Sequence, residues 1–406
     1  MATLEEIAER EHQFLLHTYS RYPVVLARGK GVFVYDLEGK RYLDFVSGLG
    51  VNALGHAHPR IVKAIREQAA KLLHVSNLYY HEYQGRLAEK LCQLSGGSAG
   101  LSRVFFSNSG TEAIEGSIKL ARLAGHRAGG AAKCRLVALE GSYHGRTFGA
   151  LSLTGQDKHR KGFEPLLEDV TFVKQNDVEG LRAAVNDNTC AIVLEPIFGE
   201  GGIYECSAEF LGECRRLADR HRAALIFDEI QCGLGRTGTI FAFQNFGVMP
   251  DMVAIAKPLA AGLPLGAFVV KEDFASAIGP GQHGTTFGGG PLACRIALEF
   301  LAIVEEEKLL ENVTRVGGYL RQELSGLVEK RAAAKEVRGR GFIQGLQLDI
   351  PARPIVDAGL AEGVLFNSTQ DTVVRFLPPF LLEEKHVDKG IRVLKKLLGK
   401  KQKAAA

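Results

Sequence analysis

The 406-residue chain contains no tryptophan, only three methionines, and no C-x-x-C pair among its seven cysteines. Scattered cysteines in odd number argue against a disulfide framework and a zinc site, and they are typical of a reducing compartment. No window approaches the roughly 18 consecutive apolar residues that a membrane-spanning helix needs. The sequence therefore predicts a cytoplasmic protein with no membrane partner.

A strong charge bias is also absent, since the formal net charge is +4. The C-terminal run KKLLGKKQK (395–403) is interpreted as the solvated end of a helix, so we expect no nucleic-acid partner. The acidic start MATLEEIAEREHQFLL favours a helix over a signal peptide. His56 and His58 could form a metal pair, but they lack a cysteine or acidic partner at ligand spacing, and we expect no metal.

What the chain does contain is a regular alternation of short apolar runs with helical segments. GVFVYDLEGKRYLDF (31–45) predicts a β-hairpin around Glu38 and Gly39. The apolar runs that follow are RVFFSN, RLVALEG, VTFVKQ, CAIVLEP, ALIFDEI, MVAIA and GAFVV. Apolar strands separated by helices indicate an α/β domain with a mostly parallel sheet, whose ligand binds beyond the carboxyl ends of the strands. From about Pro291 long helices and a few strands predict a separate α+β domain.

The strand in AALIFDEIQCGLGRTG (223–238) is unusual because it ends in two carboxylates, Asp228 and Glu229. Its glycines fit G-x-G-x-x-G, but the TIFAFQNFG that follows is poor helix material, whereas a dinucleotide fingerprint needs a helix. We therefore interpret the glycines as a turn. A buried carboxylate is costly unless a cation meets it. Because no lysine or arginine is adjacent, the cation that meets Asp228 could belong to a ligand.

Two other strand ends carry polar groups. One strand runs into Ser109-Gly110-Thr111, which opens a helix, with Thr111 as a candidate cap. Free N–H groups there form an anion site suited to phosphate, although the same residues also suit an ordinary turn. After the next strand, Tyr143 could stack on a planar ligand and Arg146 could grip a carboxylate. A packed tyrosine and a solvated arginine are the alternatives.

A lysine at the end of an apolar strand is the strongest indication of a chemically active residue. MVAIA delivers Lys257 into a loop, where it either reaches solvent or takes part in chemistry. Glu195 ends another apolar run, Glu200 follows in a glycine-rich loop, and Thr285 and Thr286 add hydroxyls that could reach a phosphate. Pyridoxal phosphate needs a lysine for its aldehyde, an acid for its ring nitrogen and an anion site. These residues therefore suit that cofactor.

With these residues in place, the sequence as a whole resembles a known family, the class III (subgroup II) aminotransferases of PLP fold type I, and most closely the acetylornithine type. The likeness runs from Tyr19 to about Lys395. It is carried by VNALGHAHP, SNLYY, VFFSNSGTEA, YHGRT, EPIFGEGG, LIFDEIQCGLGRTG and HGTTFGGGPLAC. It implies an N-terminal segment (1–46) that packs with the small domain, a large cofactor-binding domain (47–291) and a small C-terminal domain (292–406).

The resemblance implies a role for each matching residue. Lys257 would bond the cofactor aldehyde and move the proton, and Asp228 would pair with the ring nitrogen. The other implied cofactor contacts are Ser109, Gly110 and Thr111 at the phosphate, Tyr143 and Ile230 on the ring faces, Gln231 beside the phenolic oxygen, Glu195, Thr285 and Thr286. Thr286 would come from a second subunit, so the resemblance implies a homodimer with its active sites at the interface.

The implied substrate contacts explain how one site handles two amino acids. Arg146 and Tyr19 would bind the α-carboxylate when a distal amine reacts. Glu200 and Arg375 would form a switchable pair, which opens so that Arg375 can take the α-carboxylate of glutamate. The implied reaction moves the δ-amine of N-acetylornithine to 2-oxoglutarate, giving N-acetylglutamate semialdehyde and glutamate, a step of arginine biosynthesis. Leu49 favours this reaction over ornithine transamination, where a tyrosine stands at the matching position.

Alternatives stay open at the level of the amine. Succinylornithine, ornithine, a lysine-pathway amine and 4-aminobutyrate are possible donors, and a PLP lyase or aminomutase is less favoured because the Glu200–Arg375 pair serves transamination. A non-catalytic regulator on the same fold would carry a DNA-binding unit, and none fits before Tyr19. Departures from the family pattern leave loop shape and substrate choice open, namely Phe198 for glutamine, Pro258 for glycine, Ala260 and Ala261 where glycines are common, Gly290 for asparagine, and Tyr143 where phenylalanine is commoner.

Overall fold

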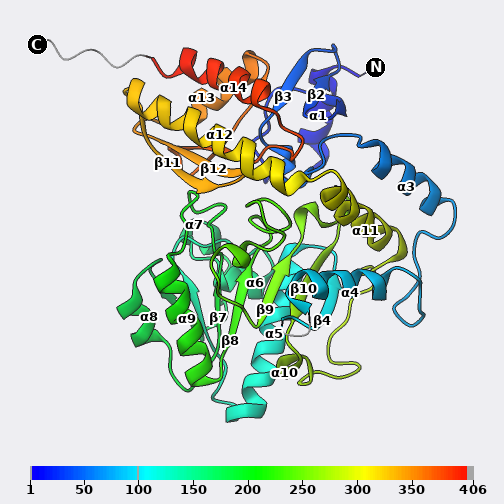
Figure 1. Ribbon diagram of the computed structural model, residues 1–406, viewed down its shortest axis with the longest axis vertical. Helices are drawn as coiled ribbons and strands as arrows, with labels where there is room; N and C mark the ends of the chain where they lie inside the picture. Colours follow the sequence, from blue (N-terminus) through cyan, green and yellow to red (C-terminus); the bar gives the residue numbers. More distant parts are fainter. Residues whose placement is uncertain (1, 98–99, 400–406) are drawn as a thin grey trace, which may run out of the picture.

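The structure is a computed structural model that describes residues 2–97 and 100–399. It has a large sheet covered by helices, and a smaller layered part in which the C-terminal elements lie beside the N-terminal strands (Figure 1). Within the described ranges, no helix combines the length and apolar character that crossing a bilayer requires. Residues 400–403 of the basic C-terminal run lie outside the described residues.

The large sheet has seven strands in the order β4-β10-β9-β8-β7-β5-β6, and the seven predicted apolar runs supply one strand each. Only β10 runs antiparallel to its neighbours, which confirms a mostly parallel sheet. The strands are β4 (Arg103–Ser107), β5 (Arg135–Leu139), β6 (Val170–Val173), β7 (Thr189–Leu194), β8 (Ala224–Asp228), β9 (Met252–Ile255) and β10 (Gly266–Val270).

Alternate residues of the central strands pack on opposite faces of this sheet. Ala224 and Ile226 of β8 join the cluster that contains α5, whereas Leu225 and Phe227 join the cluster that contains α9. Both faces are therefore covered, and this explains why the strands are continuously apolar. The helices of this part are α4 (Gln84–Leu94), α5 (Gly110–Gly129), α6 (Phe148–Leu153), α7 (Asp157–Arg160), α8 (Val178–Ala184), α9 (Ala208–His221) and α10 (Glu272–Ala275), with the 3-10 turns η2 (Ala242–Asn245) and η3 (Lys257–Ala260). The helix α3 (Pro59–Ala69) packs against the later helix Pro291–Glu306.

The C-terminal part is α+β, as the sequence predicts. Its antiparallel sheet has the order β11-β12-β15-β14, and α12 packs against β11. The edge strand β11 was not predicted, because its charged sequence AKEVRGR lacks an apolar run. The elements are α11 (Pro291–Glu306), α12 (Leu309–Lys330), β11 (Ala334–Arg340), β12 (Ile343–Leu348), α13 (Arg353–Ala361), β13 (Val364–Leu365), β14 (Asn367–Thr369), β15 (Val373–Phe376) and α14 (Glu384–Leu397).

The N-terminal segment forms a sheet with a strand from the other end of the chain. The predicted hairpin is present, and Gly39 in its turn has a φ of 85°. In the order β1-β2-β3-β13, the last strand pairs in parallel with β3, which is the packing we expect if residues 1–46 belong with the small domain. The elements are α1 (Leu4–Phe14), β1 (Leu26–Lys30), β2 (Phe33–Asp36), β3 (Arg41–Asp44) and α2 (Ser47–Gly50).

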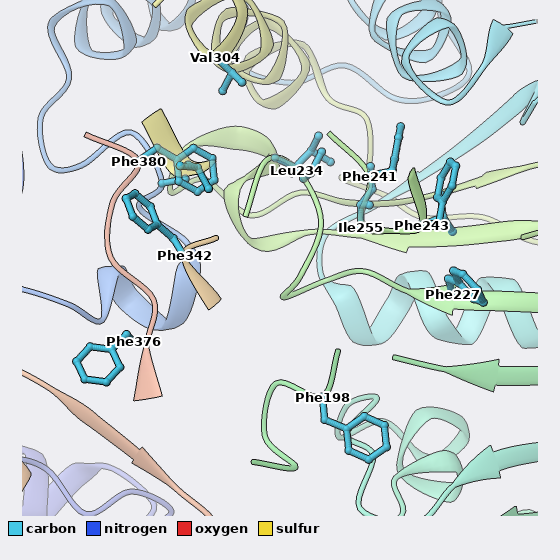
Figure 2. Close-up of a cluster of buried hydrophobic side chains, with 14 of the residues drawn as sticks. Phe198, Phe227, Leu234, Phe241, Phe243, Ile255, Val304, Phe342, Phe376 and Phe380 are labelled. Carbon is cyan, nitrogen blue, oxygen red and sulfur yellow. The ribbon is translucent and has the colours of Figure 1, made fainter. Parts of the chain in front are cut away.

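One apolar cluster runs from the large sheet into the C-terminal part. Figure 2 shows Leu234 between Phe380 on one side and Phe241 on the other. In the same loop Arg236 is 1% exposed, and its guanidinium lies over the Phe380 ring at 4.7 Å. Its Nη1 donates to the carbonyls of Phe342 and Pro378, and its Nη2 donates to the carbonyl of Gly50. A single buried arginine therefore joins three separate parts of the chain.

Candidate active site

A cavity of about 440 Å³ lies beyond the carboxyl ends of the central strands, where the sequence predicts a ligand. Eleven of the predicted site residues line it together with Val51, Asn108 and His144. These eleven are Ser109, Gly110, Thr111, Tyr143, Arg146, Glu195, Glu200, Asp228, Ile230, Gln231 and Lys257. Residues that stand up to 148 positions apart in the sequence therefore meet in one site.

Asp228 ends β8 with its side chain 3% exposed. Its Oδ1 accepts from the N–H of Ile230 at 3.0 Å, and its Oδ2 lies 2.7 Å from Nδ1 of His144. An ionised carboxylate only accepts, so Nδ1 is the donor in this contact whenever the carboxylate carries its charge. The Nε2 of His144 is buried without a hydrogen-bond partner. Sequence reasoning missed His144; its only local signal is its place beside Tyr143 at a strand end.

Lys257 follows β9 at the start of η3, in a strained backbone conformation. Its φ is 38°, in the left-handed region that residues other than glycine adopt rarely and that is often found at functional sites. Burial lowers the pKa of the Lys257 ammonium, although Glu200 and Asp228 act in the opposite direction. A lysine amine with a lowered pKa is suited to attack a carbonyl.

The predicted anion site lies at the N-terminus of α5, which faces the cavity. Ser109 is the N-cap, and its Oγ accepts from the N–H of Glu112 at 3.3 Å. Our expectation that Thr111 caps the helix was wrong, because Thr111 lies inside the first turn and its Oγ1 accepts from the N–H of Arg146 at 3.2 Å. A Cβ added at Gly110 would lie 2.7 Å from Cδ1 of Ile230. Any larger residue at this position would therefore displace the Ile230 side chain, which lines the cavity.

Glu195 is a second buried carboxylate beside Asp228. Its Oε1 accepts from the N–H of Tyr143 at 2.8 Å, and its Oε2 accepts from the N–H of Gly199 at 2.9 Å. Burial, reinforced by the charge of Asp228, raises the pKa of Glu195 above its ordinary value. Glu195 thus holds two loops at the cavity wall.

The predicted pair of Glu200 and Arg375 is closed in this structure. Arg375 Nη1 lies 2.5 Å from Glu200 Oε1, and it also donates to the Gln231 side-chain oxygen at 3.2 Å. Burial acts to raise the pKa of Glu200, but the Arg375 charge and hydrogen bond outweigh it and hold that pKa below its ordinary value. Arg375, although 1% exposed, does not itself line the cavity and reaches it through these two partners.

The remaining predicted residues lie around or outside the cavity. Arg146 is exposed at its mouth, and its Nε donates to the Tyr143 hydroxyl at 3.2 Å. Tyr19 is 79% exposed and is not part of the described lining. Thr285 accepts from the side chain of Asn108, which is a lining residue, whereas Thr286 faces solvent. The position of Leu49 is also outside the lining, which Val51 joins instead.

The carboxylate of Glu229, which directly follows β8, has a different role. Glu229 is buried, and it accepts from the N–H groups of Ala242 at 2.5 Å and Phe243 at 2.7 Å. Burial raises its pKa to about 8. The glycines between 233 and 238 form turns that start no helix, as predicted. Glu229 therefore holds the start of the loop to its end at residues 242–243, while Asp228 faces the cavity.

The histidine pair is divided between two carboxylates. His56 Nε2 lies 2.8 Å from Asp44, and His58 Nε2 lies 3.4 Å from Glu307. Across residues 2–97 and 100–399, no group of three or more histidine, cysteine, aspartate and glutamate side chains is arranged to hold a metal ion.

Phe198, one departure from the family pattern, lies behind the cavity wall. It is 3% exposed, and a Cβ added at Gly201 would lie 2.5 Å from its ring. Ala261 adopts a φ of 49° just after η3, in the segment that continues into the lining residues 262–265. Phe198 and Ala261 lie in loops outside the cavity lining, whereas Tyr143, another of these departures, lines the cavity.

Comparison with known proteins agrees with this geometry. The aminotransferase class-III family model matches residues 15–398, so the chain belongs to this family. An acetylornithine aminotransferase of Methanocaldococcus jannaschii is 46% identical over 390 residues, which cover 96% of this chain and 97% of the relative.

Solved structures similar to this chain are also aminotransferases. An acetylornithine aminotransferase from Elizabethkingia anophelis is 31% identical, with a TM-score of 0.87, covering 98% of this chain and 99% of that one. An ornithine aminotransferase from Toxoplasma gondii, with PLP at partial occupancy in its active site, is 30% identical, with a TM-score of 0.92, covering 98% and 94%. The fold is therefore PLP fold type I, and the protein is an aminotransferase.

Proposed function

We propose that this aminotransferase moves the δ-amine of N-acetylornithine to 2-oxoglutarate, with pyridoxal phosphate as its cofactor. The products are N-acetylglutamate semialdehyde and glutamate. The observation that carries the proposal is the meeting of Asp228, Lys257 and the α5 N-terminus in one cavity. The high identity to a relative named acetylornithine aminotransferase supports the choice of amine.

The residues present fit the cofactor. The start of α5 offers N–H groups to a phosphate, and the missing side chain at Gly110 lets Ile230 of the cavity wall pack against this helix end. Asp228 offers a buried carboxylate to the ring nitrogen, and Lys257 offers an amine to the aldehyde. Bound pyridoxal phosphate supplies an electron sink for charge that develops at the substrate carbon.

The protein's own groups would orient and protonate the reacting atoms. Asp228 would keep its ring-nitrogen partner charged, and His144 would hold the Asp228 carboxylate in place through Oδ2. Lys257, with its lowered pKa, would take and return the proton at the substrate carbon. Tyr143 and Ile230, both in the cavity wall, would pack on the two ring faces, with Gln231 beside the phenolic oxygen.

The outer groups would select the substrates. Arg146, with Tyr19, would hold the α-carboxylate of N-acetylornithine while the closed Glu200–Arg375 pair keeps a second carboxylate out. The pair would open for glutamate, because a carboxylate matches the Arg375 guanidinium as well as Glu200 does. One site would then serve two amino acids whose carboxylates lie at different distances from the amine.

We infer that the active unit is a homodimer. The chain exposes a group of apolar side chains that we call the 72–80 surface. It consists of Leu72, Leu73, Leu78, Tyr79 and Tyr80, and it includes Phe287. Asn77 donates to the carbonyls of Thr285 and Gly288, which ties the two segments of this surface together. Monomeric proteins rarely expose an apolar patch of this kind. A second copy that covers it would receive Thr286 near its own phosphate site.

The dimer can be tested by sedimentation. Leu78→Glu combined with Tyr80→Glu should give a monomer with lowered affinity for the cofactor. Phe163→Glu is the matched control, because Phe163 is exposed but lies outside the 72–80 surface. A double variant that stays dimeric at micromolar concentration would contradict this assignment of the interface.

The substrate is tested by adding single amines to the loaded enzyme without a keto acid and following the visible absorbance of the bound cofactor. The amines are N-acetylornithine, succinylornithine, ornithine, 4-aminobutyrate and glutamate. We expect N-acetylornithine and glutamate both to bleach the band, with N-acetylornithine fastest among the distal amines. If another distal amine is faster, the substrate assignment is wrong; if turnover does not depend on a keto acid, a lyase or aminomutase is favoured.

The compartment is proposed on separate grounds. All seven cysteines carry free thiols, and five of them are buried. Free thiols persist in a reducing compartment, so we infer a cytoplasmic protein.

A further inference from the structure

The guanidinium of Arg375 is held from two sides. On one side Nη1 contacts Glu200, Gln231 and the carbonyl of Gly199 at 2.9 Å. On the other side Nε and Nη2 both donate to the side-chain oxygen of Asn367, at 3.0 Å and 2.5 Å. Asn367 begins β14, which pairs antiparallel with the strand of Arg375.

The two donors that reach Asn367 define one edge of the guanidinium. An arginine offers five N–H groups in a planar fork, and a carboxylate binds best across two of them. Asn367 occupies the Nε–Nη2 edge. Glu200 contacts the guanidinium through Nη1, so a carboxylate that replaces Glu200 would take the Nη1–Nη2 edge, which Asn367 leaves open.

We propose that Asn367 is a positioning residue for the glutamate half of the reaction: its oxygen holds the Nε–Nη2 edge of Arg375, so that the Nη1–Nη2 edge is offered to the α-carboxylate of glutamate. This inference rests on the function proposed above. Asn367 is also neutral, so it anchors Arg375 without cancelling the charge that attracts the substrate.

The turn after Asn367 fixes the other member of the pair. Thr369 Oγ1 donates to the carbonyl of Glu200 at 2.6 Å, and the Gln370 side chain donates to the same carbonyl at 2.8 Å. The backbone at Glu200 is thus fixed while its carboxylate is held only by Arg375 and, at 3.4 Å, by Gln231. Opening the pair therefore requires a rotation of the Glu200 side chain and no movement of Arg375.

The test uses two unreactive probes and calorimetry on the cofactor-loaded enzyme. Glutarate has the two carboxylates of 2-oxoglutarate, and N-acetylnorvaline is N-acetylornithine without its distal amine. Asn367→Asp keeps the shape of the side chain and adds a charge that competes with the substrate carboxylate for Arg375. We expect it to raise the Kd of glutarate at least about tenfold and to leave that of N-acetylnorvaline within about twofold.

Asn367→Leu removes the acceptor without adding charge, and it should also weaken glutarate binding selectively. Ser368→Ala is the matched control, because successive side chains of a strand point to opposite faces, and both Kd values should stay within about twofold. In steady-state kinetics the KM for 2-oxoglutarate should rise in both Asn367 variants, with the KM for N-acetylornithine nearly unchanged.

Two results would overturn the inference. One is a glutarate Kd within about twofold of wild type in Asn367→Asp. The other is equal weakening of both probes, which indicates a merely structural role. If wild-type enzyme does not bind glutarate, the inference fails whichever amine is the donor. If it binds glutarate but converts a different distal amine, only the N-acetylornithine assignment fails.

Discussion

At the inner end of the cavity, Asp228 is buried and the start of α5 is half-buried. Both belong to the large sheet and its helices, and Lys257 directly follows a strand of that sheet. At the outer end, Arg146 and Tyr19 stand exposed on loops, and Arg375 comes from the small antiparallel sheet. The groups proposed for the cofactor are thus fixed by a rigid scaffold, whereas the groups proposed for the substrate come from separate, more adaptable segments. A protein built this way can change its substrate without losing its chemistry.

The inner end of the cavity depends most strongly on Lys257. Lys257→Ala should lower kcat by about 10⁴-fold or more, because it removes both the covalent anchor and the proton carrier. Thermal stability should stay the same or rise, since burial of the ammonium is unfavourable. The measurement is turnover with N-acetylornithine and 2-oxoglutarate, and a loss below about tenfold would contradict the assigned role.

Asp228→Asn should cost about 2 to 4 kcal/mol in the barrier to proton transfer, because the ring nitrogen loses its counter-charge. The single-turnover rate with N-acetylornithine reports this barrier directly. His144 is expected to remain in contact with residue 228, so the variant should fold normally. A rate within about threefold of wild type would refute the role of Asp228.

At the outer end, Glu200→Gln should change selectivity and leave the chemistry intact. Without the Glu200 charge the pair opens more easily, so kcat/KM for N-acetylornithine should fall about tenfold relative to that for glutamate. Both values are measured in separate half-reactions. If the two fall by the same factor, Glu200 does not act as a switch.

Glu229, although adjacent to Asp228, should affect stability alone. Its pKa in the folded protein is about 8 against an ordinary value of 4.5, so the folded state binds the proton more tightly. The protonated Glu229 makes its full contribution to the free energy of unfolding below about pH 4.5. That contribution falls by roughly 1.4 kcal/mol per pH unit as the pH rises toward 8.

Glu229→Gln removes this pH dependence. As the pH rises from 5.5 to 8, the Tm of the wild type should therefore fall relative to the Tm of the variant. This pH-dependent change adds to a constant loss of about 1 kcal/mol, which arises because the amide cannot accept from both backbone N–H groups. Activity at neutral pH should stay within about twofold. A constant difference in Tm across this range would show that Glu229 is not protonated in the folded state.

Much of the inner end could be predicted because its signals are local. An apolar run that ends in Asp228, and another that delivers Lys257, are each visible within six residues of sequence. The hairpin at Gly39 and the strands of the large sheet are predictable for the same reason. The cap of α5 was assigned two positions too late, to Thr111 instead of Ser109, because both residue types suit a cap.

The remaining features depend on contacts between distant parts of the chain. His144 and Asp228 are 84 residues apart, and no local pattern links them. Asn367 stands in a stretch whose polar residues suggest an ordinary turn, and its role is visible only beside Arg375. The charged edge strand β11 was missed because its stability comes from pairing with β12.

Arg236 makes its hydrogen bonds to main-chain oxygens of Gly50, Phe342 and Pro378, and every residue has such an oxygen. Substitutions at these three acceptors that leave the backbone in place would not remove the bonds, whereas any substitution of Arg236 removes all of them. In a comprehensive mutational scan, residue 236 should therefore be intolerant, whereas any intolerance at Gly50 and Phe342 should follow from the positive φ of Gly50 and the burial of Phe342, and not from loss of the bonds to Arg236. For the same reason, residue 236 and these three positions should show no covariation in related sequences, although their contacts connect separate parts of the molecule.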